Sequence, residues 1–319
     1  MNSHLSKSIV STICYYSALN YPLTAFEIWK FMIDRQDSCS MNFGDEFEKK
    51  DYSLFDVMSE LENSNELWRL IGNSSGYYFL KGEECLVEER IRNDKISNIK
   101  LKRLRRVVQL LRVVPFVRMI LVTGRLSMKN AEQESDWDLL VVLRDRRIWI
   151  GRTLVTLLTH FIGKRRYGRK IKDRVCLNYF LTTNSLEITD KNIFSSSEYM
   201  FCVPMFDTDG YYERFQLKNH WIKNIRMNYY ISETSNLRRI CDSNFSISVR
   251  KYLEKLFDLD GLESFLRKIE KKKIENNPKT KMESSFIEAT DDALIFLPKP
   301  QGPLVFDKYQ EKLERAMIF

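Results

Sequence analysis

Two short apolar runs that enclose a polar loop constrain this 319-residue chain more than any other feature. The runs are Val117–Thr123 and Leu139–Leu143, and their length and composition predict two buried strands. The loop between them opens with Gly124 and ends with Asp136 and Asp138. Because residues two apart on a strand point to the same side, the two aspartates should present their carboxylates together.

Paired carboxylates beside a glycine turn suit a divalent cation and a phosphate group. Carboxylate oxygens and water are the ligands that Mg²⁺ prefers, and the phosphates of a substrate usually complete its shell. Gly124 permits a tight turn and a close approach of the backbone to phosphate. The pattern therefore predicts a magnesium site at Asp136 and Asp138, and the simpler alternative is that both aspartates only cap a turn before a strand.

The order of strand, glycine turn, spacer, paired aspartates and apolar strand resembles the core of the polymerase-beta-type nucleotidyltransferase superfamily. The resemblance covers the middle third of the chain and implies a mixed sheet flanked by helices, with Asp136 and Asp138 as catalytic metal ligands. It implies one or two Mg²⁺ ions as cofactor and a nucleoside triphosphate as substrate. The implied reaction is transfer of a nucleoside monophosphate to a hydroxyl acceptor.

The turn after the first strand supplies the predicted phosphate contacts, which are Gly124, Arg125, Ser127 and Lys129. Arg125 stands where the superfamily has serine, and an arginine can hold phosphate through two parallel hydrogen bonds. Ser127 offers a nearby hydroxyl in place of that serine. Lys129 replaces the small residue expected in such a turn, so it is either a further phosphate contact or a solvated lysine.

The superfamily usually carries a third carboxylate on a neighbouring strand. The best candidate strand here is Arg174–Leu181, and the matching position is Asn178, the third predicted catalytic residue. An amide cannot take a proton from the acceptor hydroxyl, and it binds a divalent cation more weakly than a carboxylate does. Asp173 and Glu187 lie near the two ends of this segment, where each is either a replacement or a surface residue.

Residues 1–88 have the pattern of a winged-helix-like domain. Helical spacing predicts a first helix, Thr24 should cap a second, and Ser53 with Asp56 forms a capping box for a third that contains Phe55, Met58 and Leu61. Two runs, Leu67–Ile71 and Tyr77–Leu80, are the predicted strands of a hairpin.

The predicted third helix tests whether this domain binds DNA. Ser53–Glu62 contains Asp56, Glu60 and Glu62 and no lysine or arginine, so it would repel the phosphates that supply most of the affinity for DNA. We therefore expect a structural or protein-contact role for the domain.

The rest of the chain is predicted to be mainly helical, within an α+β fold. We expect a basic linking helix at 89–113, the nucleotidyltransferase-like domain at 114–206, a helical cap at 207–270, and a charged linker and C-terminal tail at 271–319. A helix is predicted at Arg147–Ile162, and Tyr211–Ile225 and Ile247–Ile269 have the helical apolar spacing expected of the cap. The loop Lys164–Arg174 is dense in positive charge and would either steer a triphosphate or an RNA end, or lie solvated.

Composition narrows the compartment and the class of protein. The net charge is +8, and none of the six cysteines forms a Cys-x-x-Cys pair, which predicts reduced thiols rather than a zinc framework or disulfides. No apolar run is long enough to span a bilayer, and the N-terminus lacks a secretory pattern, so we expect a cytoplasmic protein without a membrane partner.

Three functions follow from these patterns. The first is an active nucleotidyltransferase whose acceptor is a small molecule, a protein side chain or an RNA end. The second, favoured by Arg125 and Asn178, is a catalytically reduced member that binds nucleotide or a protein partner. The third is a nucleic-acid-binding regulator, against which the acidic third helix counts.

Overall fold

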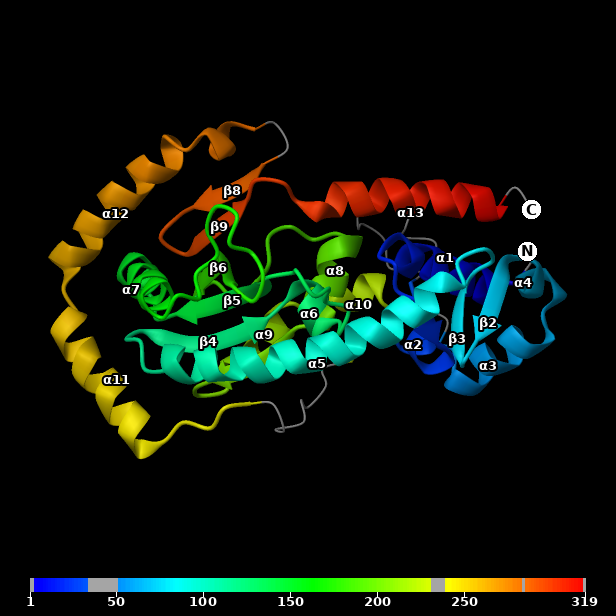
Figure 1. Ribbon diagram of the computed structural model, residues 1–319, viewed down its shortest axis with the longest axis horizontal. Coiled ribbons are helices and arrows are strands. Elements are labelled where there is room, and N and C mark those ends of the chain that lie inside the picture. The colour runs from blue at the N-terminus through cyan, green and yellow to red at the C-terminus, as the bar shows by residue number, and fades with distance from the viewer. Residues whose placement is uncertain (1–2, 34–50, 231–238, 283–284, 318–319) are drawn as a thin grey trace.

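The structure of the chain is a computed structural model that describes residues 3–33, 51–230, 239–282 and 285–317 (Figure 1). It contains a three-stranded sheet of order β1-β3-β2 and a six-stranded sheet of order β7-β4-β5-β6-β9-β8, each accompanied by helices. In the larger sheet β5 and β6 are parallel and the other pairs are antiparallel. The predicted α+β class with a mixed sheet is therefore confirmed.

The N-terminal segment, here the described part of residues 3–80, contains the smaller sheet. Its elements are α1 His4–Ala18, β1 Leu23–Thr24, α2 Ala25–Lys30, α3 Leu54–Asn63, α4 Asn65–Leu70, β2 Ile71–Ser74 and β3 Tyr77–Leu80. The capping boxes of Thr24 on α2 and Ser53 on α3 are present as predicted. The predicted strand Leu67–Ile71 is wrong, because the Ser64 side chain accepts the N–H of Leu67 and starts α4, so that β2 begins only at Ile71.

The buried face of α3 also differs from the prediction. Val57 and Leu61 are buried against the N-terminal core, whereas Phe55 is 77% and Met58 42% exposed. Apolar residues occupy more than one face of this short helix, so spacing alone did not identify the buried one.

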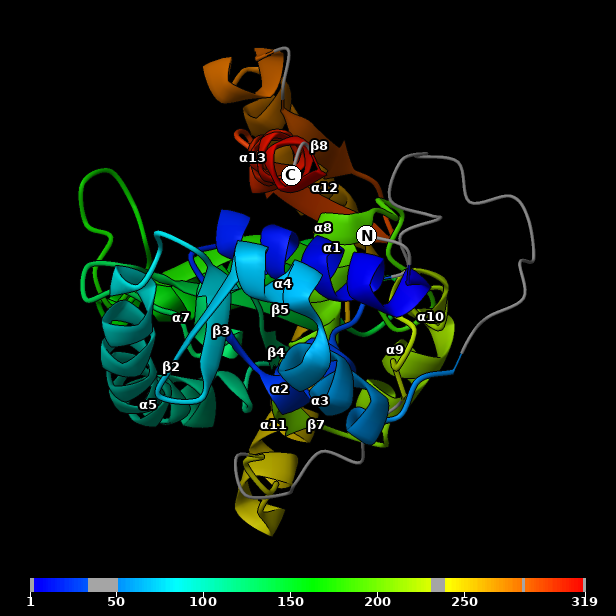
Figure 2. The same ribbon diagram turned by 90° about the vertical axis from the view of Figure 1, so that its right-hand side faces the viewer.

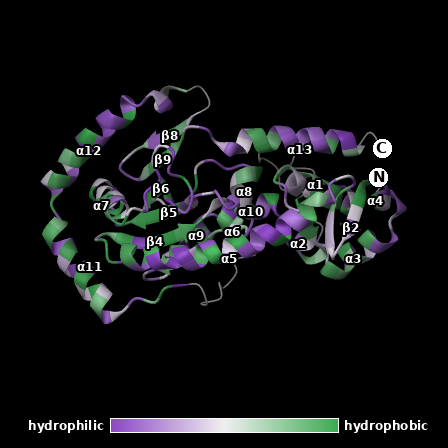
Figure 3. Cartoon of the chain, in the orientation of Figure 1, coloured by the Kyte–Doolittle hydropathy of each residue, from purple (hydrophilic) through white to green (hydrophobic). Residues whose placement is uncertain are grey.

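The central sheet extends beyond the region in which we predicted it. Its strands are β4 Val117–Val122, β5 Trp137–Leu143, β6 Val175–Thr182, β7 Val203–Asp207, β8 Phe286–Ala289 and β9 Ala293–Leu297. The antiparallel pair β8-β9 joins the edge of β6, although its residues were predicted to lie in a charged linker and tail. Ala293, Leu294 and Ile295 are buried there, which makes β9 part of the core. In Figure 3 the strands of this sheet are mainly hydrophobic, while α5 alternates between hydrophilic and hydrophobic residues.

Helices cover the sheet and connect it to the N-terminal segment. They are α5 Cys85–Leu111, α6 Gly124–Ser127, α7 Ile148–Phe161, α8 Ile193–Met200, α9 Tyr211–Lys218, α10 Ile222–Ile225, α11 Asn244–Phe257, α12 Asp260–Glu275, the 3-10 helix η1 Pro278–Lys281 and α13 Gln301–Met317. The C-terminal α13 packs across α1, which runs across the view in Figure 2 while α13 is seen end-on. Between them the Ser11 and Tyr309 hydroxyls are 2.7 Å apart and buried. Among the described residues, none of these helices has the length and apolar composition that crossing a membrane requires.

Two segments with helical apolar spacing are helical as expected, and each is divided into two helices. Tyr211–Ile225 divides into α9 and α10 at Asn219, whose side chain hydrogen-bonds the backbone of Leu186 and Ile188. Ile247–Ile269 divides into α11 and α12 at Asp258, where the carboxylate accepts hydrogen bonds from Arg144 and Arg147. A polar side chain with a tertiary partner overrides the local helical spacing at each break.

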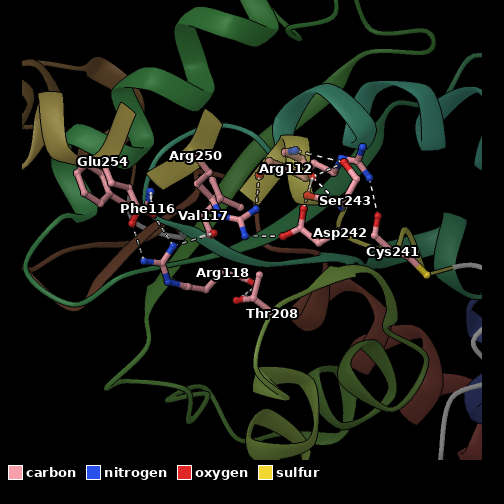
Figure 4. A network of polar contacts seen from close by, with 11 residues as sticks. Arg112, Phe116, Val117, Arg118, Thr208, Cys241, Asp242, Ser243, Arg250 and Glu254 are labelled. Atoms are coloured by element: carbon pink, nitrogen blue, oxygen red, sulfur yellow. Dashed lines mark hydrogen bonds and ion pairs between the residues drawn. The ribbon is translucent and has the colours of Figure 1, made fainter. Parts of the chain in front are cut away.

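The helices α11 and α12 curve around one end of the central sheet (Figure 1). Partly buried polar contacts attach α11 to β4 and to the residue that follows α5, as Figure 4 shows. Arg118 on β4 donates to Glu254 at 2.7 Å, and Arg250 donates to the Arg112 carbonyl at 2.8 Å and to Asp242, just before α11, at 2.5 Å. The Arg118 guanidinium is one of the causes that hold the pKa of Glu254 below its usual range. These contacts fix the outer helices to the sheet without entering the site described next.

Candidate functional site

One large cavity lies where the edge of the central sheet meets the N-terminal segment and α13. Its volume is about 1590 Å³, and its walls come from α1, α6, β5, β6, α8, the β8-β9 pair and the start of α13. Asp136, Asp138 and Gly124 all line it. The polar loop from Gly124 to Asp138 therefore forms part of the wall of a cavity that is large enough for a nucleotide.

The two predicted metal-binding carboxylates lie side by side in this wall. Asp136 directly precedes β5, and Asp138 is the second residue of that strand. One carboxylate oxygen from each and the Sγ of Cys176 all lie within 4.8 Å of one another. This spacing lets a single cation contact all three ligand atoms after small side-chain adjustments.

Gly124 is required by its contact with Asp138. It begins α6 with a φ of +64°, and a Cβ placed on it would lie 2.7 Å from Asp138 Oδ2. Any other residue would both strain the backbone and collide with the carboxylate. The predicted glycine bend therefore lies directly beside Asp138, one of the two predicted ligands.

The carboxylate pair carries an unbalanced negative charge. Burial and the neighbouring Asp136 raise the pKa of Asp138 to about 7. Arg166, from the basic loop, partly opposes this rise, since its Nη1 lies 2.5 Å from Asp136 Oδ2 and 3.4 Å from Cys176 Sγ. A group that favours the charged form of both aspartates would have to be a stronger cation than this half-exposed guanidinium.

Glu198 is a third carboxylate at the site, and the sequence analysis missed it. It lies on α8 and lines the same cavity. Burial and nearby Asp138 raise its pKa to about 7, against the lowering effect of a hydrogen bond from the Gly124 N–H. Its segment, Ile193–Met200, has three serines and no charged neighbour within the helix, so the sequence holds no motif that marks it.

The strand beside Asp138 presents a thiol where Asn178 was expected. In the parallel pairing of β5 with β6, Asp138 lies opposite Cys176 and Leu140 lies opposite Tyr179. Two residues of β6, Leu177 and Asn178, therefore oppose one residue of β5, which is a β-bulge. Asn178 still lines the cavity, but it lies in the bulge, two residues beyond the position opposite Asp138.

Neither acidic residue considered as a replacement takes part in the site. Asp173 accepts hydrogen bonds from Lys100 at 3.0 Å and Arg103 at 2.5 Å, and so ties the basic loop to α5. Glu187 is half exposed and pairs with Lys191 at 2.5 Å on the surface. Both have the surface or structural role that was the simpler alternative.

The predicted phosphate contacts divide in the structure. Arg125 lines the cavity, but its guanidinium donates to Glu132 at 2.6 Å and to the Asn130 carbonyl at 3.2 Å. The hydroxyl of Ser127 is buried and donates to the Gly124 carbonyl at 2.7 Å, so it shapes the turn instead of facing a ligand. Lys129 Nζ lies 3.4 Å from Asp94 on α5, outside the cavity wall, and this finding replaces the phosphate contact predicted there.

Further basic residues line the cavity around the carboxylates. They are Arg165 of the basic loop, Lys279 of η1, and Lys299 and Lys308 near the start of α13. Positive side chains in the wall of a concave site attract anions and orient them. The sequence marked the basic loop and the basic run Lys268–Lys281, which contains Lys279 and was expected to be solvated, but it did not mark Lys299 and Lys308, which come from the distant C-terminal part of the chain.

Comparison of the chain with protein-family models, curated proteins and solved structures found no match. What the site can do therefore follows from its own geometry. Two carboxylates and a thiol can hold a divalent cation, a third carboxylate with a pKa near 7 can exchange a proton, and several cations can hold an anion in the same cavity.

Proposed function

We propose that the cavity binds a nucleoside triphosphate together with a divalent cation and transfers a nucleoside monophosphate to a hydroxyl acceptor. The observation that carries the proposal is that Asp136 and Asp138 bring ligand oxygens within 4.8 Å of each other in the wall of a large cavity, where Gly124 leaves room for the Asp138 carboxylate. We extend it to a winged-helix-like assignment for residues 1–88, a nucleotidyltransferase-like core and a cytoplasmic location.

Each residue of the site has a place in this reaction. Asp136 and Asp138 would hold the cation, which polarises the α-phosphate and stabilises the leaving pyrophosphate when bound. Arg165 and Arg166 of the basic loop would bind the outer phosphates, where guanidinium groups form paired hydrogen bonds. Glu198, with its pKa near 7, is the carboxyl we assign to take the proton of the acceptor hydroxyl.

The two aspartates of the ligand set support a role for Mg²⁺, whereas the sulfur of Cys176 does not. The oxygen ligands of Asp136 and Asp138 fit this hard cation, and one or two such ions could bind together with the phosphates. The acceptor stays open among a small molecule, a protein side chain and an RNA end, because residues that bind an acceptor carry no motif here.

A second candidate function is nucleotide or protein binding without transfer. It is favoured by Cys176 in place of a third carboxylate opposite Asp138 and by the engagement of Arg125 with Glu132. DNA binding by the N-terminal segment is not proposed, since α3 carries Asp56, Glu60 and Glu62.

Calorimetric titration with a nucleoside triphosphate tests the proposal. We expect binding in the presence of a divalent cation and its loss in the double variant Asp136→Ala and Asp138→Ala. Glu134→Gln is the matched control, because this carboxylate is 75% exposed, lies two residues before Asp136 and should leave binding unchanged. Unchanged binding in the double variant would remove the proposal, and pyrophosphate release then separates an active enzyme from a binding protein.

Gly124→Ala provides a second test. Its Cβ would push against Asp138 Oδ2, so we expect cation affinity to fall at least about tenfold. Gly76→Ala is the control, because Gly76 has a similar φ of +77° with no atom within 4 Å of the added Cβ. It should cost about 1 kcal/mol of stability and leave cation binding intact. Equal cation binding in both variants would contradict the role of the glycine contact.

A further inference from the structure

Cys176 differs from the cysteines that are only packed in the core. Cys14 is fully buried in the core of the N-terminal segment and Cys202 in the core beneath α8 and α9. Cys176 instead lines the cavity, lies opposite Asp138 and has its Sγ within 4.8 Å of ligand oxygens from both aspartates. Packing alone does not explain a cysteine at this position, because the wall around its thiol is polar.

A sulfur ligand changes which cation the site prefers. Mg²⁺ is bound through oxygen, whereas thiolate ligands favour zinc and other thiophilic divalent ions. Catalytic zinc sites commonly have three protein ligands and leave a fourth position open to water or substrate. Two carboxylate oxygens and one sulfur, facing a cavity, match that arrangement.

We infer that Cys176 is a metal ligand and that Asp136, Asp138 and Cys176 together select a thiophilic divalent cation, such as zinc, over magnesium. The inference rests on the proposed function in using the same site, but it concerns the identity of the ion. The bulge in β6 contributes to this scheme, because the register of Leu140 with Tyr179, continued without it, would put Leu177 and not Cys176 opposite Asp138.

Arg166 identifies where the cation binds. Its Nη1 contacts both Asp136 Oδ2 and Cys176 Sγ, so one positive group already bridges two of the three ligands. A divalent ion in the same position neutralises more charge and displaces the guanidinium into the cavity. Arg166 is then free to contact the phosphates of a bound nucleotide.

Cobalt is the probe that tests this inference on the full chain, because a thiolate bound to Co²⁺ produces a near-ultraviolet charge-transfer band that oxygen ligands do not. We expect the band in the natural protein, its loss in Cys176→Ser, and at least about a tenfold loss of Zn²⁺ affinity in that variant. Cys176→Asp, which supplies oxygen in place of sulfur, should bind Mg²⁺ more tightly and Zn²⁺ more weakly than the natural protein.

Cys241→Ser is the control, because Cys241 is an exposed cysteine outside the cavity wall, and it should retain the band. Cobalt that binds by calorimetry without a charge-transfer band in the natural protein would overturn the inference and leave the proposed function intact. So would a band that persists in Cys176→Ser but disappears in Cys241→Ser. If Co²⁺, Zn²⁺ and Mg²⁺ all fail to bind, with and without nucleoside triphosphate, the inference and the proposed function fail together.

Discussion

The helix α8 contacts two groups of buried charge that are built in opposite ways. Ser196 and Ser197 of this helix bind the guanidinium of Arg226, which is fully buried at the junction with the N-terminal segment. The next residue, Glu198, belongs to the cavity that contains Asp136 and Asp138. One short helix therefore binds a buried guanidinium through its serines and carries, beside them, a carboxyl group whose pKa is raised to about 7.

The Arg226 group is complete as it stands. Its guanidinium donates to the carbonyls of Phe31 and Ile193, both at 3.1 Å, and it stacks 4.9 Å from the ring centre of Tyr15. These partners are neutral, yet they supply the hydrogen bonds that a buried cation requires. Because they come from α1, α2 and α8, Arg226 fixes the N-terminal segment to the helix that carries Glu198.

The carboxylate group, by contrast, brings acids close together in a partly enclosed place. Burial, and after it the repulsion between neighbouring carboxylates, raises the pKa values of Asp138 and Glu198 to about 7, and the half-exposed guanidinium of Arg166 only partly opposes the rise at Asp138. A buried charge that serves the fold is hydrogen-bonded by its surroundings, whereas carboxyl groups with perturbed pKa values that line a cavity are candidates for a functional site. The comparison indicates a structural role for Arg226 and supports the binding role that we propose for the cavity.

The largest expected effect is the loss of stability in Arg226→Met. The variant leaves two carbonyls and two serine hydroxyls without their donor in a buried place, so we expect the free energy of unfolding to fall by about 3 kcal/mol. Urea denaturation followed by circular dichroism measures this change. Arg315→Met is the control, since Arg315 is 74% exposed and pairs with Glu311 within one helix, and it should shift stability by less than about 0.5 kcal/mol.

If Arg226→Met lowers stability no more than the control does, Arg226 does not have the structural role that the comparison gives it. It would mean that the neutral acceptors find water as readily as they find the guanidinium. The N-terminal segment would then be attached mainly by its apolar contacts, such as those of α1 with α13.

Glu198→Gln tests the other side of the comparison, with an intermediate effect. The pKa of Glu198 rises from 4.5 to about 7 on folding, so the unfolded chain ionises first and stability is lost as pH rises through that range. Glutamine removes this loss, and we expect the variant to be about 1–2 kcal/mol more stable at neutral pH, with no difference below about pH 4.5. Each pKa unit corresponds to about 1.4 kcal/mol, reduced here because the side chain is not fully enclosed.

Glu187→Gln is the matched control for that experiment, because Glu187 is half exposed and pairs with Lys191 on the surface. Its stability relative to the natural protein should not change with pH between 4.5 and 7 by more than about 0.3 kcal/mol. If Glu198→Gln behaves like this control, Glu198 is already satisfied and the contrast with Arg226 disappears.

The sequence predicted those features of the fold that depend on residues close together in the chain. The capping boxes at Thr24 and Ser53 and the strands on either side of Gly124 depend on residues close in sequence, and the structure confirms them. The adjacency of Asp136 and Asp138 also follows from the period of one strand.

The partners of these two aspartates could not be predicted in the same way. Cys176 reaches Asp138 only because a bulge shifts the register of two strands, and that shift depends on packing across the sheet. Glu198 reaches Gly124 because Arg226, distant in sequence, holds α8 in place. Both depend on tertiary contacts that no periodicity in this sequence records.

The smallest expected effect, Arg166→Ala, sharpens the comparison most. Removing the guanidinium takes away the only positive group that the structure places on Asp136 among the described residues, so the carboxylates become still less balanced. We expect divalent cations to bind up to about fivefold more tightly, which is the scale of a half-exposed ion pair, while nucleoside triphosphate binds more weakly. Calorimetry with each ligand separates the two changes.

Arg169→Ala is the control, because Arg169 is an exposed residue of the same loop outside the cavity wall, and this variant should alter neither affinity. Weaker cation binding in Arg166→Ala would show that Arg166 positions the carboxylates instead of competing with the cation for them. The carboxylate group would then resemble the Arg226 group, whose charge is satisfied by the protein alone.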